Sequence, residues 1–574
     1  MIVKKYLILF SILFATQLCL GAAKSGGTLR LASISDPKTF NLIIAQETST
    51  TEAVGLLFEG LTKINGETTE AEPCLAESWS HSEDGLEWTF VLRKGVLWFD
   101  GKELSADDVL FTYNSLIYNK DIPSSSRDIF TVDGKIFKVE KIDNYTVKFT
   151  TPTPYAPLLY NLSQPILPKH ILEKSVQDSK FNEMWGINTK PSDLIGTGPF
   201  KLVEYLPGQR LVYEKNSNYW KKDSEGNTLP YIDKIVTYIV QNIDAQILKF
   251  KAGEIDIVSL QGKDYAIVKG EEKKKNCTVY DCGPSFGTDF LSFNMSPIFT
   301  DKQKLVWFGD INFRQAIAFA IDRESMINNV LYGMGSVQHA SMSESAKAFY
   351  NPNVKHYECD TKRSKDILKN AGFVDSDNDG ILEKPAGVPV KFTILTNAEN
   401  NMRVDLGTII QSDLKAIGID ASLRPIDFNN LVTKLNYTHD WDCVLLGFTG
   451  GIEPHSGKNV WAIDGQLHIW NQKPEAQRTQ SMTEEPTTNY QQQTADWEKE
   501  IDRLFNTGVQ ELDPQKRKQI YDKWQEITAE NLPLIYTVNA KVIYAINNKI
   551  KNIRPSAYGG ALHNVEGIWI EEIK

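Results

Sequence analysis

The sequence predicts an α/β protein, and three observations support this fold class. Runs with strand-like patterns alternate with helix-like runs along most of the chain. The 574 residues are 41% hydrophobic and 24% charged, which is close to globular averages and excludes a disordered, collagen-like or coiled-coil chain. No segment repeats at a fixed period, so solenoids and propellers are also excluded. A chain of this length is expected to form roughly three to four domains.

The N-terminal segment has the composition of a secretory signal. Lys4 and Lys5 give it a positive start, residues 6–20 are mostly apolar, and residues 21–23 are the small ones that a signal peptidase needs. About fifteen apolar residues fall short of the roughly 20 that cross a bilayer, which makes a membrane anchor the weaker interpretation. We expect cleavage after Ala23 and export of the mature chain to the periplasm.

Export would expose the cysteines to oxidation. Cleavage would leave an odd number of them, so at least one must stay free or pair between chains. The remaining cysteines are Cys74, Cys277, Cys282, Cys359 and Cys443. Cys277 and Cys282 are close in sequence, and a bridge between them across a turn is one expectation.

Two segments in the first 120 residues have clear secondary-structure patterns, one of a strand and one of a helix. The alternation from Trp88 to Arg93 predicts a strand. Ser105 is a suitable N-cap for a helix, and this helix places Val109, Tyr113 and Leu116 on one face.

The central segment predicts a parallel sheet. Residues 390–395 and 419–425 have strand patterns, and residues 404–417 between them have a helical apolar stripe that ends at Gly418. Strand, helix and strand in this order form a βαβ unit, whose two strands run parallel.

The C-terminal third combines a polar loop with a helix. Residues 471–496 are rich in Gln, Thr, Glu and Pro and predict a long surface loop. Residues 513–514 supply an N-cap and a first-turn proline, and Ile520, Trp524 and Ile527 then form the buried stripe of a helix.

The sequence carries no recognisable catalytic motif. Its eight histidines form no HExxH pair, and P-loop and GxGxxG patterns are missing. One GxSxG match, at residues 283–287, is followed by the strand predicted at 291–294 and lacks the strand–turn–helix context of a nucleophile elbow. Carboxylate pairs are common in an acidic chain and do not by themselves indicate a glycosidase. The formal net charge of −11 repels phosphate backbones and argues against a nucleic-acid partner. These features argue against an enzyme and against a nucleic-acid-binding protein.

One acidic segment is similar to a calcium loop. Asp375, Asp377 and Asp379 occupy positions 1, 3 and 5 of such a loop, and Gly380 makes its turn at position 6. Position 12 is Ala386 in place of the usual glutamate, and a strand is predicted to follow, so an acidic turn is the alternative. We expect no cofactor unless this loop holds a structural calcium. Its candidate ligands are Asp375, Asp377, Asp379 and Glu383.

Two glycine-rich segments have the pattern of ligand loops. Residues 447–457 follow the apolar strand predicted at 443–446, and residues 287–290 precede a strand predicted at 291–294. Glycines let backbone amides approach a ligand closely, and nearby aromatic residues can supply apolar walls. An ordinary surface turn is the alternative. The candidate ligand-binding residues are Phe448, Thr449, Gly450, Gly451, Glu453, Trp461, Thr288, Asp289 and Phe290.

Twelve short motifs are spread over nearly the whole mature chain, in the same order as in a known protein family. They are GGTLR at 26–30, CLAESW at 74–79, WTFVLR at 88–93, FDGK at 99–102, LSADDV at 104–109, PILPKH at 165–170, GTGPF at 196–200, RQAI at 314–317, IDR at 321–323, KR at 516–517, WQEI at 524–527 and LPL at 532–534. Each motif is weak alone. Together they resemble the extracellular solute-binding proteins of family 5, the dipeptide-, oligopeptide- and nickel-binding receptors of bacterial ABC importers.

This resemblance implies a two-lobed periplasmic binding protein fold, with hinged lobes around an inter-lobe cleft that holds a small-molecule or peptide ligand. The implied organisation is a signal peptide at 1–23, a first lobe formed by 24–60, 191–285 and 532–574, an inserted domain at 61–190, and a second lobe at 286–531. It also implies a monomer whose closed form is recognised by the membrane subunits of an ABC importer.

One departure from the family pattern affects the expected ligand. Peptide receptors of the family usually carry an aspartate in the loop that resembles residues 447–454, and it pairs with the ammonium group of the peptide. Gly450 or Gly451 stands at that position here, and Glu453 or Asp289 would have to substitute, because an unpaired buried ammonium is costly. Peptides are the expected ligand, and oligosaccharides and other solutes remain open. A secreted carbohydrate-binding or carbohydrate-active protein is the alternative, and a chaperone or adhesion module is a third hypothesis.

Overall fold

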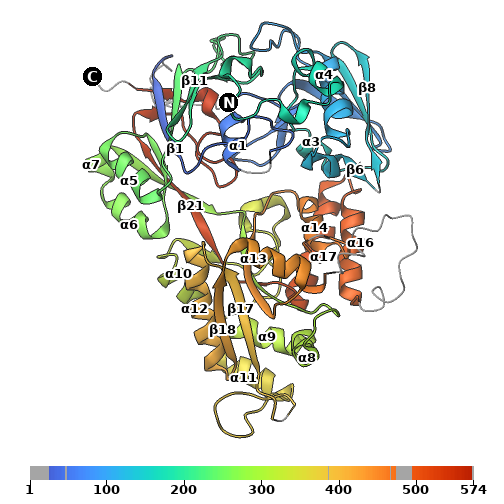
Figure 1. The fold of residues 1–574 in the computed structure, drawn as a ribbon, viewed down its shortest axis with the longest axis vertical. Coiled ribbons are helices and arrows are strands. Elements are labelled where there is room, and N and C mark those ends of the chain that lie inside the picture. Colours follow the sequence, from blue (N-terminus) through green and yellow to red (C-terminus); the bar gives the residue numbers. More distant parts are fainter. Residues whose placement is uncertain are drawn as a thin grey trace, which may run out of the picture.

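The computed structural model describes residues 25–45, 48–132, 134–385, 387–465, 467–472 and 494–571. Two bodies are stacked along the long axis, and strand β21 (Val538–Asn547) runs from one into the other (Figure 1). The expected signal peptide and most of the loop expected at 471–496 lie outside the described residues. Among the described residues, no helix is long and apolar enough to span a bilayer.

The first lobe is built around a four-stranded sheet of order β1-β12-β11-β10. Its first strand pairs in parallel with β12, and the other neighbours are antiparallel. These strands and the adjoining helix are β1 (Thr28–Ser33), β10 (Phe200–Leu206), β11 (Arg210–Lys215), β12 (Lys234–Ile239) and α1 (Thr48–Val54). The C-terminal pair β22 (Ile550–Lys551) and β23 (Trp569–Ile570) also joins this body.

The inserted domain contains a second four-stranded sheet, of order β4-β5-β9-β8. Its elements are β2 (Thr62–Ile64), β3 (Ala71–Pro73), β4 (Ala76–His81), β5 (Glu87–Leu92), α2 (Ala106–Leu110), β6 (Thr131–Val132), β7 (Lys135–Ile136), β8 (Lys138–Asp143), β9 (Thr146–Thr150), α3 (Leu158–Asn161) and α4 (Lys169–Gln177). Buried side chains from this domain and the first lobe form one continuous core, so the two parts are packed as one body.

Ser105 caps helix α2, as the sequence predicts. Its hydroxyl accepts from the Asp107 amide, and the Asp108 carboxylate accepts from the Ser105 amide, which completes a capping box. The helix continues as a π-helical turn over 111–117, and Val109, Tyr113 and Leu116 are fully buried.

The chain passes between the lobes along β14 (Cys277–Pro284) and returns along β21, and these two strands pair antiparallel. Strand β13 (Ile257–Ser259) also pairs with β21. The flanking helices are α5 (Ile243–Ala252), α6 (Gly262–Gly270) and α7 (Glu272–Lys275), and side chains of α5 and α6 form a small core with these strands. A paired two-strand connection is a suitable hinge, because rotation can be absorbed by a few residues at its ends.

The second lobe is a five-stranded sheet of order β18-β17-β19-β15-β20, in which β17, β18 and β19 run parallel. Its strands are β15 (Thr288–Phe293), β17 (Lys391–Asn397), β18 (Asp420–Ile426), β19 (Cys443–Phe448) and β20 (Ile535–Tyr536), and β16 (Gly335–Val337) pairs with β21. Its helices are α8 (Lys302–Gly309), α9 (Ile311–Ala320), α10 (Arg323–Asn329), α11 (Thr361–Asn370), α12 (Asn401–Ala416), α13 (Phe428–Thr433), α14 (Lys458–Trp461), α16 (Asp496–Gly508) and α17 (Pro514–Asn531).

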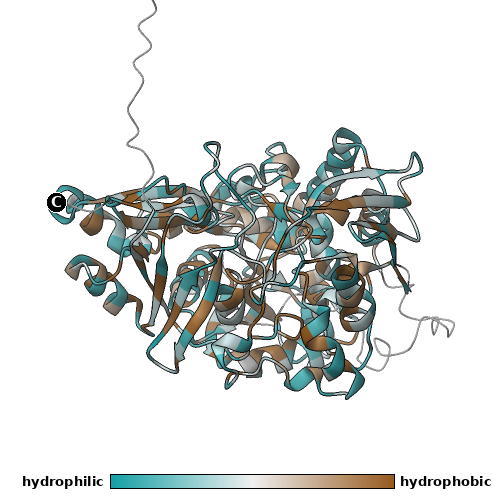
Figure 2. Cartoon of the chain, turned by 90° about the horizontal axis from the view of Figure 1, so that it is seen from above, coloured by the Kyte–Doolittle hydropathy of each residue, from teal (hydrophilic) through white to brown (hydrophobic). Residues whose placement is uncertain are grey.

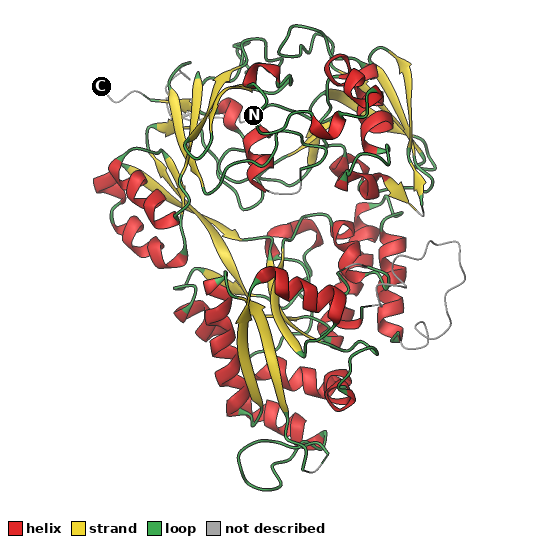
Figure 3. Cartoon of the chain, viewed as in Figure 1, coloured by secondary structure: helices red, strands yellow, loops and turns green. Residues whose placement is uncertain are grey.

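Helices cover both faces of this sheet (Figure 3). Successive residues of β19 show why: Leu445 packs into one core with α9 and α12, while Val444 and Leu446 pack into the other with α16 and α17. Hydrophobic residues accordingly concentrate along the strands and hydrophilic ones on the outlying helices (Figure 2). The predicted βαβ unit is confirmed as β17, α12 and β18, with Gly418 in the left-handed conformation after the helix.

Two expectations are corrected. Cys277 and Cys282 lie in one extended strand, about 16 Å apart at the rise of a β-strand, and both are free thiols, so no turn brings them together. The second lobe does not end at residue 531, because the backbone of β20 pairs with β15 in its sheet. The other expected domain boundaries stay predictions.

Candidate functional site

The two glycine-rich segments singled out in the sequence lie side by side. Strands β15 and β19 pair antiparallel, with Thr288 opposite Phe448 and Asp289 opposite Gly447. Thr288, Asp289 and Phe290 therefore belong to the strand itself and not to a loop before it, because their backbone groups take part in this ladder. Residues about 160 positions apart in sequence thus meet at one end of the second-lobe sheet.

An ion pair closes this end of the sheet. Arg403, in the first turn of α12, donates from Nε to Asp289 Oδ1 at 2.8 Å and from Nη1 to Asn397 Oδ1 at 2.7 Å. Burial raises the pKa of Asp289, and the neighbouring guanidinium only partly offsets this. A Cβ atom at Gly447 would lie 2.5 Å from Arg403 Nη2, so the glycine leaves the space that the ion pair occupies.

The loop after β19 packs directly on the chain that enters β15. A Cβ atom at Gly450 would lie 1.6 Å from the carbonyl oxygen of Phe286, so only glycine fits there without moving the backbone. The ring of Phe286 in turn contacts Tyr558 of the first lobe, with ring centroids 5.5 Å apart. The loop is therefore next to a contact between the lobes, and Thr449 within it is exposed.

Glu453 has a structural partner. Its carboxylate is bound by Arg517 of α17, with Nη1 2.9 Å from Oε2, and both side chains are less than a tenth exposed. It also accepts from the His455 amide at the start of a short helical turn. A buried carboxylate that already has a guanidinium partner has little left to offer an ammonium group.

The three predicted aromatic walls differ in exposure. Phe290 is fully buried, and Trp461 is 5% exposed and packs between Trp470 and Trp524 in the second-lobe core. Neither of these two side chains presents a face to solvent in this structure. Phe448 is half-buried, with its ring 4.9 Å from that of Phe290, and is the best placed of the three to contact a ligand.

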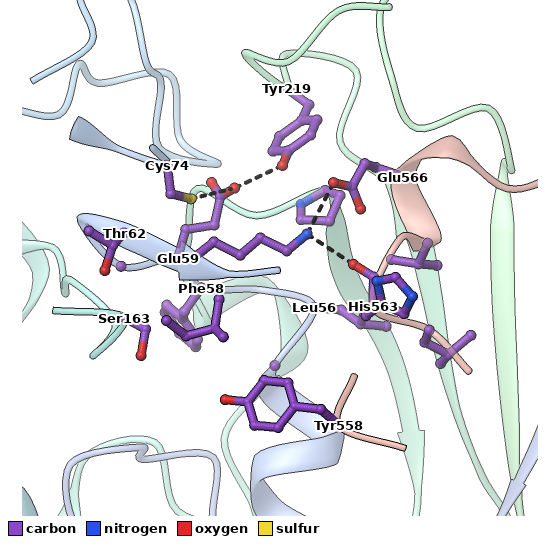
Figure 4. Close-up of a pocket in the computed structure, with 17 residues that line it drawn as sticks. Leu56, Phe58, Glu59, Thr62, Cys74, Ser163, Tyr219, Tyr558, His563 and Glu566 are labelled. Carbon is purple, nitrogen blue, oxygen red and sulfur yellow. Dashed lines mark hydrogen bonds and ion pairs between the residues drawn. The ribbon is translucent and has the colours of Figure 1, made fainter. Parts of the chain in front are cut away.

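Two neighbouring cavities in the first lobe were missed by sequence reasoning. The first has a volume of about 350 Å³ and is lined by residues that include Phe58, Glu59, Tyr558 and Glu566 (Figure 4). The second has a volume of about 610 Å³ and is lined by the end of β1, part of α1 and residues of β13 and β21. The residues common to both are Gly55, Leu56, Leu562 and His563.

The wall of the first cavity carries charged groups that bind one another. Lys63 and Lys221 both bind Glu566 Oε1, at 3.2 and 2.6 Å. Burial opposes ionisation of Glu566, but the two ammonium groups outweigh it and lower its pKa to about 2. Glu59 is bound by neutral donors instead, with the Tyr219 hydroxyl 2.8 Å from Oε1, and burial raises its pKa.

These cavities combine apolar walls with a few fixed polar groups, which is the composition of ligand-binding pockets. Sequence reasoning missed them because each lining comes from segments far apart in the chain. Those of the first cavity lie around residues 55–74, 163–219 and 558–566, and those of the second around residues 31–56, 211–259 and 544–563. A signal existed in the sequence: Glu59 and Lys63 are charged residues within the otherwise mostly apolar run 56–64.

The acidic loop of the second lobe brings its carboxylates close together. Single carboxylate oxygens of its four candidate ligands lie within 4.8 Å of one another; these are Asp375, Asp377, Asp379 and Glu383. Glu383 is buried and accepts from the Ser376 amide at 2.9 Å, and the Gly380 amide donates to Asp375. All-oxygen ligands at this spacing suit a hard cation such as calcium.

Comparison with known proteins places the chain in a family. Residues 70–465 match the family model described as bacterial extracellular solute-binding proteins, family 5 Middle. A probable ABC transporter-binding protein of Deinococcus radiodurans is 31% identical over 92% of this chain and 90% of its own length. The oligopeptide-binding protein AppA of Bacillus subtilis is 31% identical over 80% of each chain.

Solved structures agree with this assignment. The structure of AppA from Bacillus subtilis in complex with a nonapeptide is similar with a TM-score of 0.70 and 27% identity, over 96% of this chain and all of that chain. The chain therefore belongs to the bacterial extracellular solute-binding proteins of family 5.

Proposed function

We propose that this receptor captures short peptides, or solutes that carry the same charged groups, between its two lobes and delivers them to the membrane subunits of an ABC importer. The observation that carries the proposal is the contact between Phe286 and Tyr558, since it brings the loop after β19 against the first-lobe cavity that Tyr558 lines. The bound solute would contact the half-buried Phe448 on one side and these cavities on the other.

The charges of the site favour a zwitterionic solute. Asp289 stands beside the loop that usually supplies the ammonium-binding carboxylate, and its ion pair with Arg403 engages only one of its oxygens, Oδ1. In the first lobe Lys63 and Lys221 share the single carboxylate of Glu566, and burial raises the pKa of the nearby Glu59. An ammonium group near Asp289 and a carboxylate near the two lysines would complement both ends.

The relatives support peptides over other solutes. The AppA protein of Bacillus subtilis, named for oligopeptide binding, is among the most similar relatives. A structure of MelB in complex with stachyose shares the fold at 21% identity, so oligosaccharides belong in the test. A carbohydrate-active enzyme is not favoured.

Thermal denaturation tests the proposal. The protein is first unfolded and refolded, which removes any ligand carried through purification. A bound peptide at a hundredfold excess over its Kd would stabilise the fold by about 2.7 kcal/mol, and oligosaccharides would give no shift. Native mass spectrometry of gently purified protein would identify the natural ligand. If no peptide of two to about ten residues shifts the transition, the proposed ligand class is wrong.

Four further assignments accompany this proposal. The leader at 1–23 is cleaved, the mature protein works in the periplasm as a monomer, and it has no enzymatic activity. The loop at 375–383 holds one structural calcium through its four carboxylates, which lie within 4.8 Å of one another. N-terminal sequencing of the exported protein and sedimentation of the purified chain test the first two assignments.

A further inference from the structure

Three side chains of the second lobe converge outside the cavities described above. His339 follows strand β16, and His356 and Glu358 lie in the segment before α11. His339 Nε2 is 3.6 Å from Glu358 Oε1, and His356 Nδ1 is 3.8 Å from the same oxygen. One potential ligand atom from each residue lies within 4.8 Å of the other two.

These separations are close to those of a metal centre. Imidazole and carboxylate ligands bind zinc at about 2.0–2.2 Å, which places tetrahedral ligands about 3.3–3.5 Å apart. The two imidazole rings are stacked, with centroids 4.5 Å apart and planes 20° apart, so one ring must turn for both nitrogens to point at one ion. His356 is 47% exposed and Glu358 is 78% exposed, so the His356 ring has room to turn and the Glu358 side chain has room to move toward the ion.

His339 is the fixed member of the group. Its side chain is 9% exposed. The Arg323 guanidinium is held in place by the carbonyls of Tyr357 and Tyr536. The Glu358 carboxylate compensates the positive charge that Arg323 places near the site.

We propose that His339, His356 and Glu358 form a binding site for one divalent late first-row transition metal ion, with zinc as the expected occupant. Two imidazoles and one carboxylate suit zinc, nickel or copper better than the oxygen-preferring calcium. None of the three residues lines either first-lobe cavity, so this ion is separate from the transported solute.

The position of the site suggests what the ion does. Val337 of β16 pairs with Val538 at the start of β21, the strand along which the chain returns to the first lobe. A metal bound by His339 and by the 356–358 segment would link this surface segment to the residues that follow β16, next to the start of β21. The ion would thus stabilise the structure locally, close to the hinge.

Titration calorimetry on the full, untagged protein after treatment with a chelator tests the site with zinc alone. We expect one zinc ion per chain, and His356→Ala and Glu358→Gln should each weaken binding by at least about tenfold. Cobalt should give a visible absorption band that both variants lose. Both residues are on the surface, so circular dichroism should show that the variants remain folded.

Two control variants make the result specific. His81→Ala removes an exposed histidine of the inserted domain, and Asp377→Asn removes a carboxylate of the acidic loop; zinc affinity should be unchanged in both. The proposal is overturned if the wild-type protein binds no zinc, or if His356→Ala and Glu358→Gln bind it as tightly as the wild type. Peptide-induced stabilisation is measured separately, so failure of the proposed function leaves this outcome distinct.

Discussion

The ring of Tyr155, in the inserted domain, packs edge-on against the ring of His455, in the second lobe, with centroids 6.1 Å apart. Next to it the Ala156 amide donates to the Val509 carbonyl at 2.8 Å. His455 lies two residues after Glu453, which Arg517 binds, so one end of the glycine-rich loop is held by a contact between the lobes. A further contact between the lobes joins Lys347 Nζ to the Glu67 carbonyl at 2.6 Å.

The His455 contact should weaken in acid. Burial, Lys458 and Arg517 lower the pKa of His455 from 6.5 to about 3, so the unfolded chain binds a proton that the folded chain excludes. Its contribution to stability is complete above about pH 6.5 and is lost as the pH falls toward 3. Denaturant unfolding at several pH values should show a smaller loss of unfolding free energy in His455→Leu than in the wild type. Parallel pH curves for the two proteins would contradict this assignment.

Replacing Phe448 should cost affinity more than stability. The Phe448→Ala variant loses an aromatic surface next to the proposed ligand, and peptide Kd should rise about tenfold. Phe428→Ala is the matched control, because Phe428 is 47% exposed and belongs to α13 of the same lobe. An unchanged Kd in Phe448→Ala would mean that the ligand lies elsewhere.

Gly450 and Gly451 should respond very differently to the same substitution. An alanine Cβ at Gly450 would overlap the Phe286 carbonyl, whereas one at Gly451 meets nothing within 4 Å. Gly450→Ala should lower the free energy of unfolding by about 2 kcal/mol or more and weaken ligand binding, and Gly451→Ala should stay within about 0.5 kcal/mol. Urea unfolding of both variants measures this, and equal losses would refute the close approach at Gly450.

Glu566 should stabilise the first lobe only while it is ionised. Burial works against the charge, but Lys63 and Lys221 lower its pKa from 4.5 to about 2. Its contribution, on the order of 3 kcal/mol, is therefore present above about pH 4.5 and disappears as the pH falls toward 2. Glu566→Gln should be less stable than the wild type at pH 7, with the difference shrinking in acid.

The control for this prediction is Glu571→Gln, which removes an exposed carboxylate bound to Lys551. A surface pair of this kind contributes little, so its loss should be nearly neutral at every pH. A Glu566→Gln deficit that stays constant from pH 7 to pH 3 would show that packing, and not charge, explains the effect.

Calcium should raise the melting temperature of the chelator-treated protein if the 375–383 loop holds an ion. Asp377→Asn removes one of the converging ligands and should abolish the calcium-induced shift, because a hard cation needs anionic oxygens. Asp366→Asn, at an exposed position of α11, is the control and should keep the shift. Equal calcium responses in both variants would count against the site.

Local patterns in the sequence determined most of the secondary structure that they addressed. The cap at Ser105, the helix between β17 and β18 and its end at Gly418 depend on residues a few positions apart, and the structure confirms them. The ordered motifs also led to the correct family and to its two-lobed fold. The sequence also singled out residues 447–457 and 287–290 as separate candidate ligand segments, and the structure brings them side by side, although it places 288–290 in a strand and not in a loop.

Only the tertiary structure decided which partners the charged and aromatic side chains have. Arg403 and Arg517 are distant in sequence from the Asp289 and Glu453 that they bind, and no local pattern links them. The same holds for Trp461, whose burial depends on α16 and α17, and for the first-lobe cavities, whose walls come from segments far apart in the chain. Periodicity reports which face of an element is buried, whereas the identity of a partner depends on how distant elements pack.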